Sequence, residues 1–287
     1  MTAERALVAG AGLMGHGIAQ VLAATGRTVA LYEPELSRAE AGRERIAGNL
    51  GRAVDKGRLT ATEQVAIVER IRPTADLADA ADAELVIEAV FEDAAVKTGL
   101  WAEIDRVAPS SAIFASNTSS ISIDLLAAAV NEARRPQFVG MHFFSPVPVM
   151  PLIEMIRGSA TSDETDAAVR RLAADMGKQV IVSADRPGFI VNRILMPFLV
   201  EAMRALEAGV GTAEDIDTGA RIGLNHPMGP LELADFVGLD VCLGIMNVLH
   251  EGLDEPQFEP PRVLVELVEA GHLGQKTKQG FYRYPRD

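Results

Sequence analysis

The sequence predicts an α/β protein: a doubly wound, mostly parallel sheet followed by a smaller, all-α domain. Strand-like apolar runs alternate with helical patterns as far as Ser183, and beyond Gly188 only helical spacing remains. The 287 residues exceed the size at which one core usually stops growing, so two domains are expected. Residues 184–188 are typical of a linker, which gives domains at 1–185 and 186–287.

Composition and charge exclude several classes of protein. The chain is 48% hydrophobic and 23% charged, as in ordinary soluble proteins, and polar residues interrupt its apolar stretches short of a membrane span. A net charge of −13 would repel nucleic-acid phosphates. The single cysteine, Cys242, excludes an intrachain disulfide and is expected in the core. The N-terminus enters an apolar strand without a signal-type segment, so a cytoplasmic protein without membrane or nucleic-acid partners is expected.

The first strand, expected at 5–9, leads into a glycine-rich turn and a helix that runs through Ala24. The turn reads Gly10-Ala11-Gly12-Leu13-Met14-Gly15, and its context is the one that a Rossmann-type dinucleotide fingerprint requires. Gly10 allows the tight turn, Gly12 lets the backbone approach a pyrophosphate, and Gly15 permits close helix packing. The helix N-terminus offers unpaired amides to the phosphates. We expect Gly10, Gly12, Leu13, Met14 and Gly15 to contact the cofactor.

The second strand, expected at 28–32, ends in Glu33. A carboxylate at this position can accept hydrogen bonds from the adenine ribose and would repel a 2′-phosphate, so NAD is favoured over NADP. The alternative is that Glu33 is only an exposed charge at a strand end.

The remaining elements follow from hydrophobic spacing. In the first domain we expect a polar helix from Pro34 to Lys56, strands near 67–71, 85–90, 112–115 and 138–144, a helix at 163–176 and a last strand at 179–183. In the second domain we expect helices at 189–208, 213–222, 231–249 and 261–270. The first of these is apolar nearly all round, which predicts a homodimer formed through the C-terminal domain.

Polar residues fall where the expected strands end, and in a parallel sheet these ends share one rim. They are Glu88 and Glu92, then residues 117–120, then His142 and Ser145. Asn117 and Thr118 could instead cap a helix. The other histidines show no HxH or HExxH spacing, so no metal site is predicted.

A proline-rich reversal gives His142 a specific partner. If the chain turns back about Pro148, antiparallel neighbours place His142 opposite Glu154. A carboxylate beside an imidazole fixes its tautomer and favours its charged form, so the pair is typical of a general base with its orienting group. The alternative is a core histidine satisfied by a buried glutamate. Asn192, just after the linker, could face a cleft or make a structural amide bond.

Taken together, these motifs resemble the short-chain L-3-hydroxyacyl-CoA dehydrogenase family, particularly its bacterial 3-hydroxybutyryl-CoA members, over nearly the whole chain. The resemblance is carried by residues 10–15, 116–120, 142–148, 188–193 and 228–235.

The resemblance implies NAD as cofactor, an acyl-CoA substrate and roles for individual residues. His142 would take the 3-hydroxyl proton, Glu154 would pair with the imidazolium, and Ser119 and Asn192 would hold the substrate oxygen. Glu92 and Lys97 would lie along the nicotinamide ribose, and Asn117 would also contact the cofactor. Lys56 and Asn49, on one face of the long helix, would meet the adenosine phosphate of CoA, although a lysine at a helix end is usually just solvated.

Three other functions remain open. A sugar-acid dehydrogenase would share the glycine loop, although Phe143 and Phe144 favour an acyl chain. A relative acting on a carrier-protein thioester would need a basic patch, which the net charge of −13 disfavours without forbidding. A dinucleotide-binding protein without catalysis is disfavoured by the intact set of His142, Glu154, Ser119 and Asn192.

Overall fold

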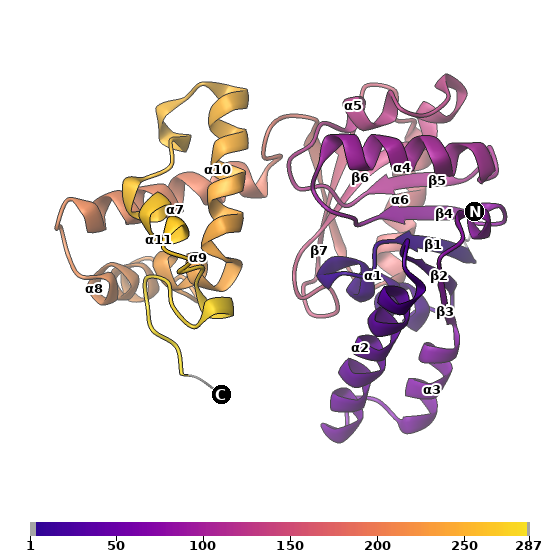
Figure 1. The fold of residues 1–287 in the computed structure, drawn as a ribbon, viewed down its shortest axis with the longest axis horizontal. Coiled ribbons are helices and arrows are strands. Elements are labelled where there is room, and N and C mark those ends of the chain that lie inside the picture. The colour runs from indigo at the N-terminus through magenta and orange to yellow at the C-terminus, as the bar shows by residue number, and fades with distance from the viewer. Residues whose placement is uncertain (1–3, 286–287) are drawn as a thin grey trace. The chain divides into compact units, whose positions relative to one another are not determined.

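The computed structural model describes residues 4–285, which divide into two compact units on either side of the Arg186–Pro187 bond. Residues 1–3, which bear on the expected lack of a signal segment, lie outside this range. Within the first unit, eight strands form one sheet in the order β3-β2-β1-β4-β5-β6-β7-β8 (Figure 1). The strands are β1 (Arg5–Ala9), β2 (Thr28–Tyr32), β3 (Ile71–Thr74), β4 (Leu85–Glu88), β5 (Ile113–Ser116), β6 (Phe138–Phe143), β7 (Leu152–Arg157) and β8 (Gln179–Ala184).

All neighbouring strands of this sheet are parallel except β6 and β7, which confirms the doubly wound, mostly parallel prediction. Strand β4 is buried along its whole length, as expected for a strand covered on both faces. The strand order reverses between β1 and β4, where open α/β sheets bind their ligands.

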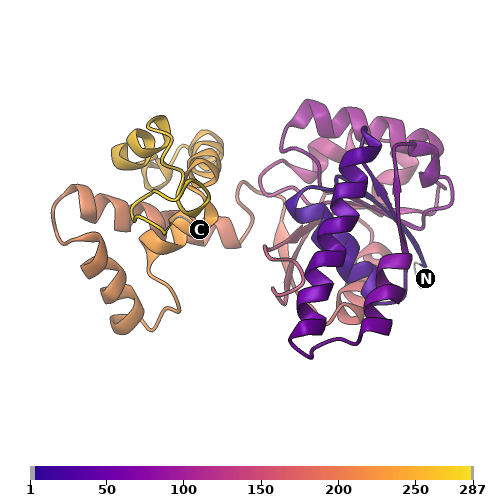
Figure 2. The same cartoon turned by 60° about the horizontal axis from the view of Figure 1, so that its bottom comes forward.

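Helices cover both faces of the sheet (Figure 1). They are α1 (Leu13–Ala24), α2 (Leu36–Asp55), α3 (Ala61–Glu69), α4 (Ala94–Val107), α5 (Ile123–Ala127) and α6 (Asp163–Asp175). Side chains of α1 and α6, such as Ile18 and Leu172, share one core with Ala115 and Val139 of the strands. On the other face, Trp101 of α4 packs with its ring centroid 4.9 Å from those of Phe114 and Phe138. Helices α2 and α3 lie side by side near the β3 edge (Figure 2).

The strand expected at 67–71 is wrong, because most of it is the end of helix α3. The Thr60 hydroxyl accepts a hydrogen bond from the Glu63 amide, and the Glu63 carboxylate accepts one from the Thr60 amide. This capping box starts a helix that continues through the β-branched residues Val65, Ile67 and Val68. The strand β3 begins only at Ile71.

The second unit is helical, with α7 (Val191–Glu207), α8 (Ala213–Thr218), the π-helical turn η3 (Gly219–Gly223), α9 (Pro230–Val237), α10 (Leu239–Leu253) and α11 (Arg262–Glu269). The single helix expected at 231–249 is wrong. Gly238 has φ +105°, a conformation that L-residues rarely adopt, and it separates α9 from α10 with a bend of 98°. Cys242 is fully buried, as predicted for a core residue.

Between Glu4 and Pro285, no single helix has the length and apolarity needed to cross a membrane. The bent pair α9 and α10 passes that test together, on length and composition alone.

Candidate active site

The glycine loop lies at the point where the strand order reverses. Gly10 has φ +102°, and a Cβ added there would lie 2.5 Å from the Ala89 carbonyl oxygen just beyond β4. A Cβ on Gly15 would lie 1.8 Å from the Gly10 oxygen. Both positions therefore require glycine. A Cβ on Gly12, in contrast, would meet no atom of the described residues within 4 Å, so the loop backbone faces open space there.

That open space fits a dinucleotide pyrophosphate. Gly12 is the N-cap of α1 and has no side chain to cover the first amides of the helix. Beside it, Leu13 is 71% exposed, whereas Met14 packs against the sheet core. Glu33 accepts a hydrogen bond of 2.6 Å from the Ala11 amide, which holds its carboxylate at the loop.

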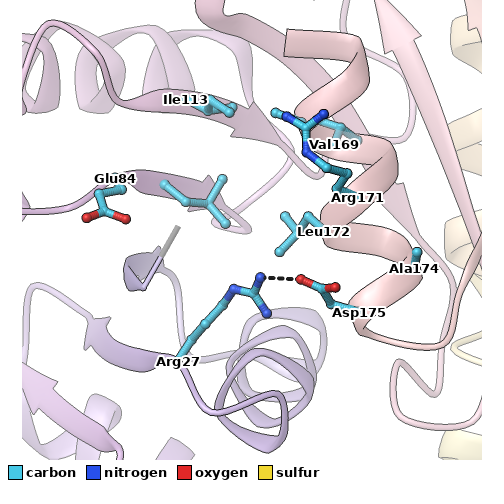
Figure 3. A pocket seen from close by; sticks show the side chains of 10 residues that line it. Arg27, Glu84, Ile113, Val169, Arg171, Leu172, Ala174 and Asp175 are labelled. Atoms are coloured by element: carbon cyan, nitrogen blue, oxygen red, sulfur yellow. Dashed lines mark hydrogen bonds and ion pairs between the residues drawn. The ribbon is translucent and has the colours of Figure 1, made fainter. Parts of the chain in front are cut away.

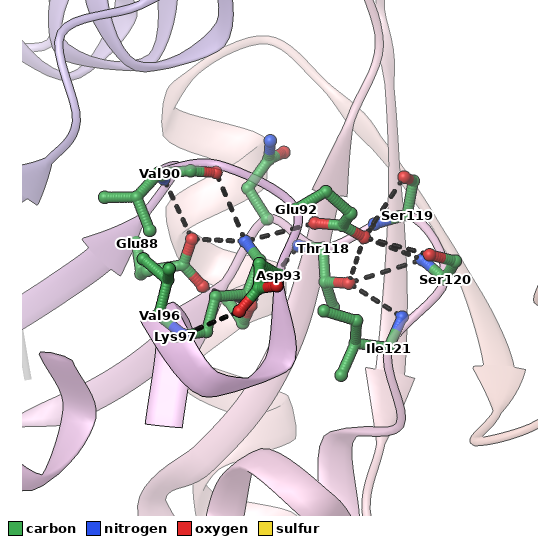
Figure 4. A network of polar contacts seen from close by, with 12 residues as sticks. Glu88, Val90, Glu92, Asp93, Val96, Lys97, Thr118, Ser119, Ser120 and Ile121 are labelled. Atoms are coloured by element: carbon green, nitrogen blue, oxygen red, sulfur yellow. Dashed lines mark hydrogen bonds and ion pairs between the residues drawn. The ribbon is translucent and has the colours of Figure 1, made fainter. Parts of the chain in front are cut away.

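A buried ion pair organises the loop after β4 (Figure 4). The Lys97 ammonium contacts the Glu88 carboxylate, and the two side chains are 1% and 0% exposed. Glu88 also accepts hydrogen bonds from the Val90 amide and, at 2.7 Å, from the Ser116 hydroxyl of β5. Lys97 reaches Glu92 as well, at 3.1 Å. Lys97 therefore also forms an ion pair with Glu92. Its predicted contact with the cofactor stays a prediction.

The Glu92 carboxylate holds the loop at residues 118–120, after β5, by hydrogen bonds. Its Oε1 accepts hydrogen bonds from the Thr118 hydroxyl at 2.5 Å and from the Ser119 and Ser120 amides at 2.9 and 3.1 Å (Figure 4). Burial raises the pKa of Glu92, but the Lys97 charge and the hydrogen bonds from Thr118 and Ser119 outweigh it, so the pKa lies below its ordinary value of 4.5. The predicted substrate contact, Ser119, is thus held by a carboxylate that is ionised at neutral pH.

The lowered pKa of Glu92 predicts a pH-dependent contribution to stability. Because the folded state favours the carboxylate, the contribution is present above pH 4.5 and is lost as pH falls through the folded pKa. Glu92→Gln should therefore lower the free energy of unfolding by up to about 1 kcal/mol at pH 7, a modest value because the side chain is 35% exposed. Urea unfolding at pH 7 and pH 4 should show the difference shrinking at the lower pH. A difference that does not change with pH would contradict this assignment.

Asn117 joins β5 to β6 and does not cap a helix. Its Oδ1 accepts a hydrogen bond of 2.9 Å from the Phe143 amide. The helix-cap alternative is therefore wrong for Asn117, and Ser122 caps α5 instead. Asn117 fixes the end of the strand that carries His142, while its predicted contact with the cofactor stays a prediction.

His142 lies opposite Glu154 in the antiparallel pair β6 and β7, which confirms the register predicted from the reversal about Pro148. The His142 Nδ1 is 3.0 Å from Glu154 Oε2, and Glu154 is fully buried. A carboxylate at Nδ1 favours a proton on that nitrogen, which leaves Nε2 as the proton acceptor of the neutral ring. The pair can therefore act as a base whose orientation is fixed.

The two phenylalanines after His142 differ in position. The ring of Phe144 lies 4.6 Å from that of His142, centroid to centroid, and is partly exposed. Phe143 is 2% exposed and belongs to the sheet core. Of the pair, only Phe144 has a side chain that is not buried in the core.

Lys178 was not identified from the sequence, although it fixes the reversal between β6 and β7. Its ammonium donates to the Val147 and Met150 carbonyls at 2.6 and 2.7 Å, and burial lowers the pKa of the amine. On the other side, a Cβ on Gly17 of α1 would lie 2.9 Å from Val147 Cβ. Contacts of this kind join residues far apart in the chain, so hydrophobic spacing carries no sign of them.

The other predicted residues lie on separate elements. Asn192 is buried at the start of α7, in the second unit. Lys56 is exposed at the C-cap of α2, and Asn49 accepts a hydrogen bond from Arg52 on the same helix. Their roles toward a substrate stay predictions.

A separate cavity of about 270 Å³ opens at the amino ends of β4 and β5 (Figure 3). Leu85, Ile113 and Leu172 line it, beside the ion pair of Arg27 with Asp175 at 2.6 Å. It lies at the end of the strands opposite to His142 and the glycine loop, so it is not part of the candidate active site.

A glycine loop with open space over Gly12 and a histidine–carboxylate pair meet at one rim of a doubly wound sheet. This combination defines a nicotinamide-dependent dehydrogenase.

Comparisons with known proteins specify the family. The family model for the 3-hydroxyacyl-CoA dehydrogenase NAD binding domain matches residues 5–186, and the model for the C-terminal domain matches residues 188–284. The chain therefore belongs to the 3-hydroxyacyl-CoA dehydrogenase family and is an NAD-dependent dehydrogenase.

Similar proteins cover the chain almost completely. The 3-hydroxybutyryl-CoA dehydrogenase of Bradyrhizobium diazoefficiens is 50% identical over 96% of this chain and 94% of that protein. The crystal structure of FadB2 from Mycobacterium tuberculosis is 45% identical with a TM-score of 0.96, and the match covers 99% of this chain and 100% of that one. The (S)-3-hydroxybutyryl-CoA dehydrogenase of Ralstonia eutropha is 41% identical with a TM-score of 0.94, over 99% and 100%.

Proposed function

We propose that the chain oxidises (S)-3-hydroxybutyryl-CoA to acetoacetyl-CoA with NAD, or catalyses the reverse reduction. The observation that carries this proposal is the His142–Glu154 pair, 3.0 Å apart at the rim that also holds the glycine loop. The relatives from B. diazoefficiens and R. eutropha bear the name of this activity and support the choice of substrate.

In this mechanism, NAD⁺ when bound accepts the hydride from C3 of the substrate. His142 takes the 3-hydroxyl proton on Nε2, and buried Glu154 stabilises the imidazolium that forms. The Ser119 hydroxyl and the Asn192 amide hydrogen-bond the substrate oxygen and fix its position. Glu92 contributes by holding the Ser119 loop.

Cofactor choice rests on Glu33. Its carboxylate lies against the glycine loop through the Ala11 amide, where it would meet the adenine ribose and repel a 2′-phosphate. The remaining contacts in this proposal fall into two groups. The cofactor is contacted by Gly10, Gly12, Leu13, Met14, Gly15, Glu92, Lys97 and Asn117. CoA is contacted by Lys56 and Asn49.

The activity is tested with purified protein, acetoacetyl-CoA and either NADH or NADPH, followed by the near-ultraviolet absorbance of the reduced nicotinamide. We expect oxidation of NADH at a kcat/KM at least about tenfold above that with NADPH, because repulsion between like charges at this site disfavours the phosphate. Absence of turnover while NADH still binds would contradict the CoA substrate and favour a carrier-bound or sugar-acid substrate.

We further propose that residues 1–185 bind NAD and that residues 186–287 serve substrate binding and homodimerisation. The second unit exposes large apolar side chains, which include Ile194 at 69% and Ile222 at 81%, and this supports an interface there. Light scattering that gives the mass of a single chain would contradict the dimer. The expected cytoplasmic location stays a prediction, which cell fractionation would test.

A further inference from the structure

The helix α2 lies directly against the glycine loop. A Cβ added to Gly42 would lie 2.7 Å from Ala11 Cβ and 3.3 Å from the Ala11 oxygen. Real Cβ atoms essentially never approach another atom within 3.0 Å, so a glycine at position 42 allows the helix to approach the loop. A glycine inside a helix is otherwise unfavourable, which points to a packing requirement here.

Two charged side chains hold the Ala11 backbone at this contact. Its amide donates to Glu33 Oε1 at 2.6 Å, and its carbonyl accepts from Arg45 Nη2 of α2 at 3.0 Å. Ala11 is 1% exposed, whereas Arg45 is exposed. Hydrogen bonds with an ionised partner are about twice as strong as neutral ones. The backbone orientation at Ala11 is therefore set from both sides.

The carbonyl held by Arg45 belongs to the same peptide plane as the Gly12 amide. In a trans peptide the C=O and N–H bonds point in opposite directions. When Arg45 holds the Ala11 carbonyl toward α2, the Gly12 amide must point away from α2. A Cβ on Gly12 would meet no atom of residues 4–285 within 4 Å, so the backbone there borders the open space that fits the pyrophosphate.

We propose that Arg45 is a positioning residue for NAD. By holding the Ala11 carbonyl, it fixes the peptide plane that presents the Gly12 amide to the pyrophosphate, before the cofactor arrives. A preorganised donor binds its ligand more tightly, because the conformational entropy of ordering the donor is not lost on binding. Arg45 acts through the loop and takes no part in the chemical step.

The test compares Arg45→Met with Arg43→Met. Arg43 lies on the same helix, but its Nε donates to the Val68 carbonyl of α3, at 3.3 Å. We expect Arg45→Met to raise the Kd for NADH, measured by nicotinamide fluorescence, by about tenfold, since a bond to a charged group is lost. Arg43→Met should leave the Kd within twofold. Turnover of Arg45→Met at saturating NADH should keep its kcat within about twofold.

Measurements at high salt distinguish positioning of the loop backbone by Arg45 from direct attraction between the Arg45 charge and the cofactor phosphates. Exposed charges are screened over about 3 Å at 1 M salt, so a pure field effect would disappear there. We expect the Kd of Arg45→Met for NADH to stay about tenfold above that of the unchanged protein in 1 M NaCl. Arg45→Lys keeps a hydrogen-bond donor and should recover part of the affinity.

An unchanged Kd, a ratio that vanishes in 1 M NaCl, or an equal loss in Arg43→Met would each overturn the proposal. Because NADH binding is measured without acyl-CoA, failure of the proposed substrate would leave this test intact. Thermal unfolding without cofactor checks that both variants are folded.

Discussion

Replacing His142 by glutamine should lower kcat by about 10²- to 10⁴-fold, which is the usual contribution of a general base. Glutamine fills a similar volume and can accept a hydrogen bond, but it cannot take a proton at neutral pH. The Kd for NADH should stay within twofold, because the proposed role of His142 is to take the substrate proton and its described contacts are with Glu154 and Phe144. Stopped-flow reduction of acetoacetyl-CoA measures kcat, and fluorescence titration measures the Kd.

The companion variant Glu154→Gln tests the orienting role. The amide keeps the shape of the buried side chain and a hydrogen-bonding oxygen, but it offers no charge to an imidazolium. The loss in kcat should therefore be smaller than for His142→Gln, about 10- to 100-fold, and His272→Gln provides a control on an unrelated histidine. If His142→Gln retained more than a tenth of the activity, the base would have to be another group.

The pairing of His142 with Glu154 could be predicted because it is local. Antiparallel strands joined by a short reversal pair in a register set by the position of the turn, and the prolines at 146, 148 and 151 mark that turn in the sequence. The glycine loop is also local, since strand, turn and helix follow one another. Motifs of this kind show their geometry within about a dozen residues.

Two differences between the predicted and the observed elements have local causes. The run at 67–71 contains β-branched residues typical of strands. The capping box formed by Thr60 and Glu63 nevertheless starts a helix, which extends to Glu69. At 231–249 the helical spacing continues in register across Gly238, and only its positive φ ends α9. Hydrophobic spacing reports which face is buried and does not report where one helix stops and another begins.

The supporting contacts of the site could not be predicted, because they depend on the tertiary fold. Asn117 meets the Phe143 amide, Lys178 meets the reversal at 147–150, and Arg45 meets Ala11 across 34 positions of the chain. Asn117 and Lys178 lie in loops and Arg45 lies on a helix, and each binds a backbone group that is distant in the sequence, which the neighbouring residues do not indicate. Gly42 lies inside helix α2, where a glycine can indicate a close approach, but Gly48 and Gly51 of the same helix make no such approach.

Lys97→Met should destabilise the protein by about 3–5 kcal/mol at pH 7, as expected when one partner of a buried ion pair is removed. The Lys97 and Glu88 side chains are 1% and 0% exposed, so the variant would leave the Glu88 carboxylate as an uncompensated buried charge. Urea unfolding gives the free energy directly. A loss below about 1 kcal/mol would mean that water or another cation reaches Glu88.

The double variant Lys97→Met with Glu88→Gln removes both charges and should recover at least about 1 kcal/mol of the loss, since contacting partners are not additive. Recovery of stability should not restore full activity. Glu88 also binds Ser116, and Lys97 also supports Glu92, which holds the Ser119 loop. In the double variant Glu92 loses the cation beside it, so KM for acetoacetyl-CoA should be higher than in the wild type even though the fold is regained. A double variant with wild-type KM would show that the ion pair serves stability alone.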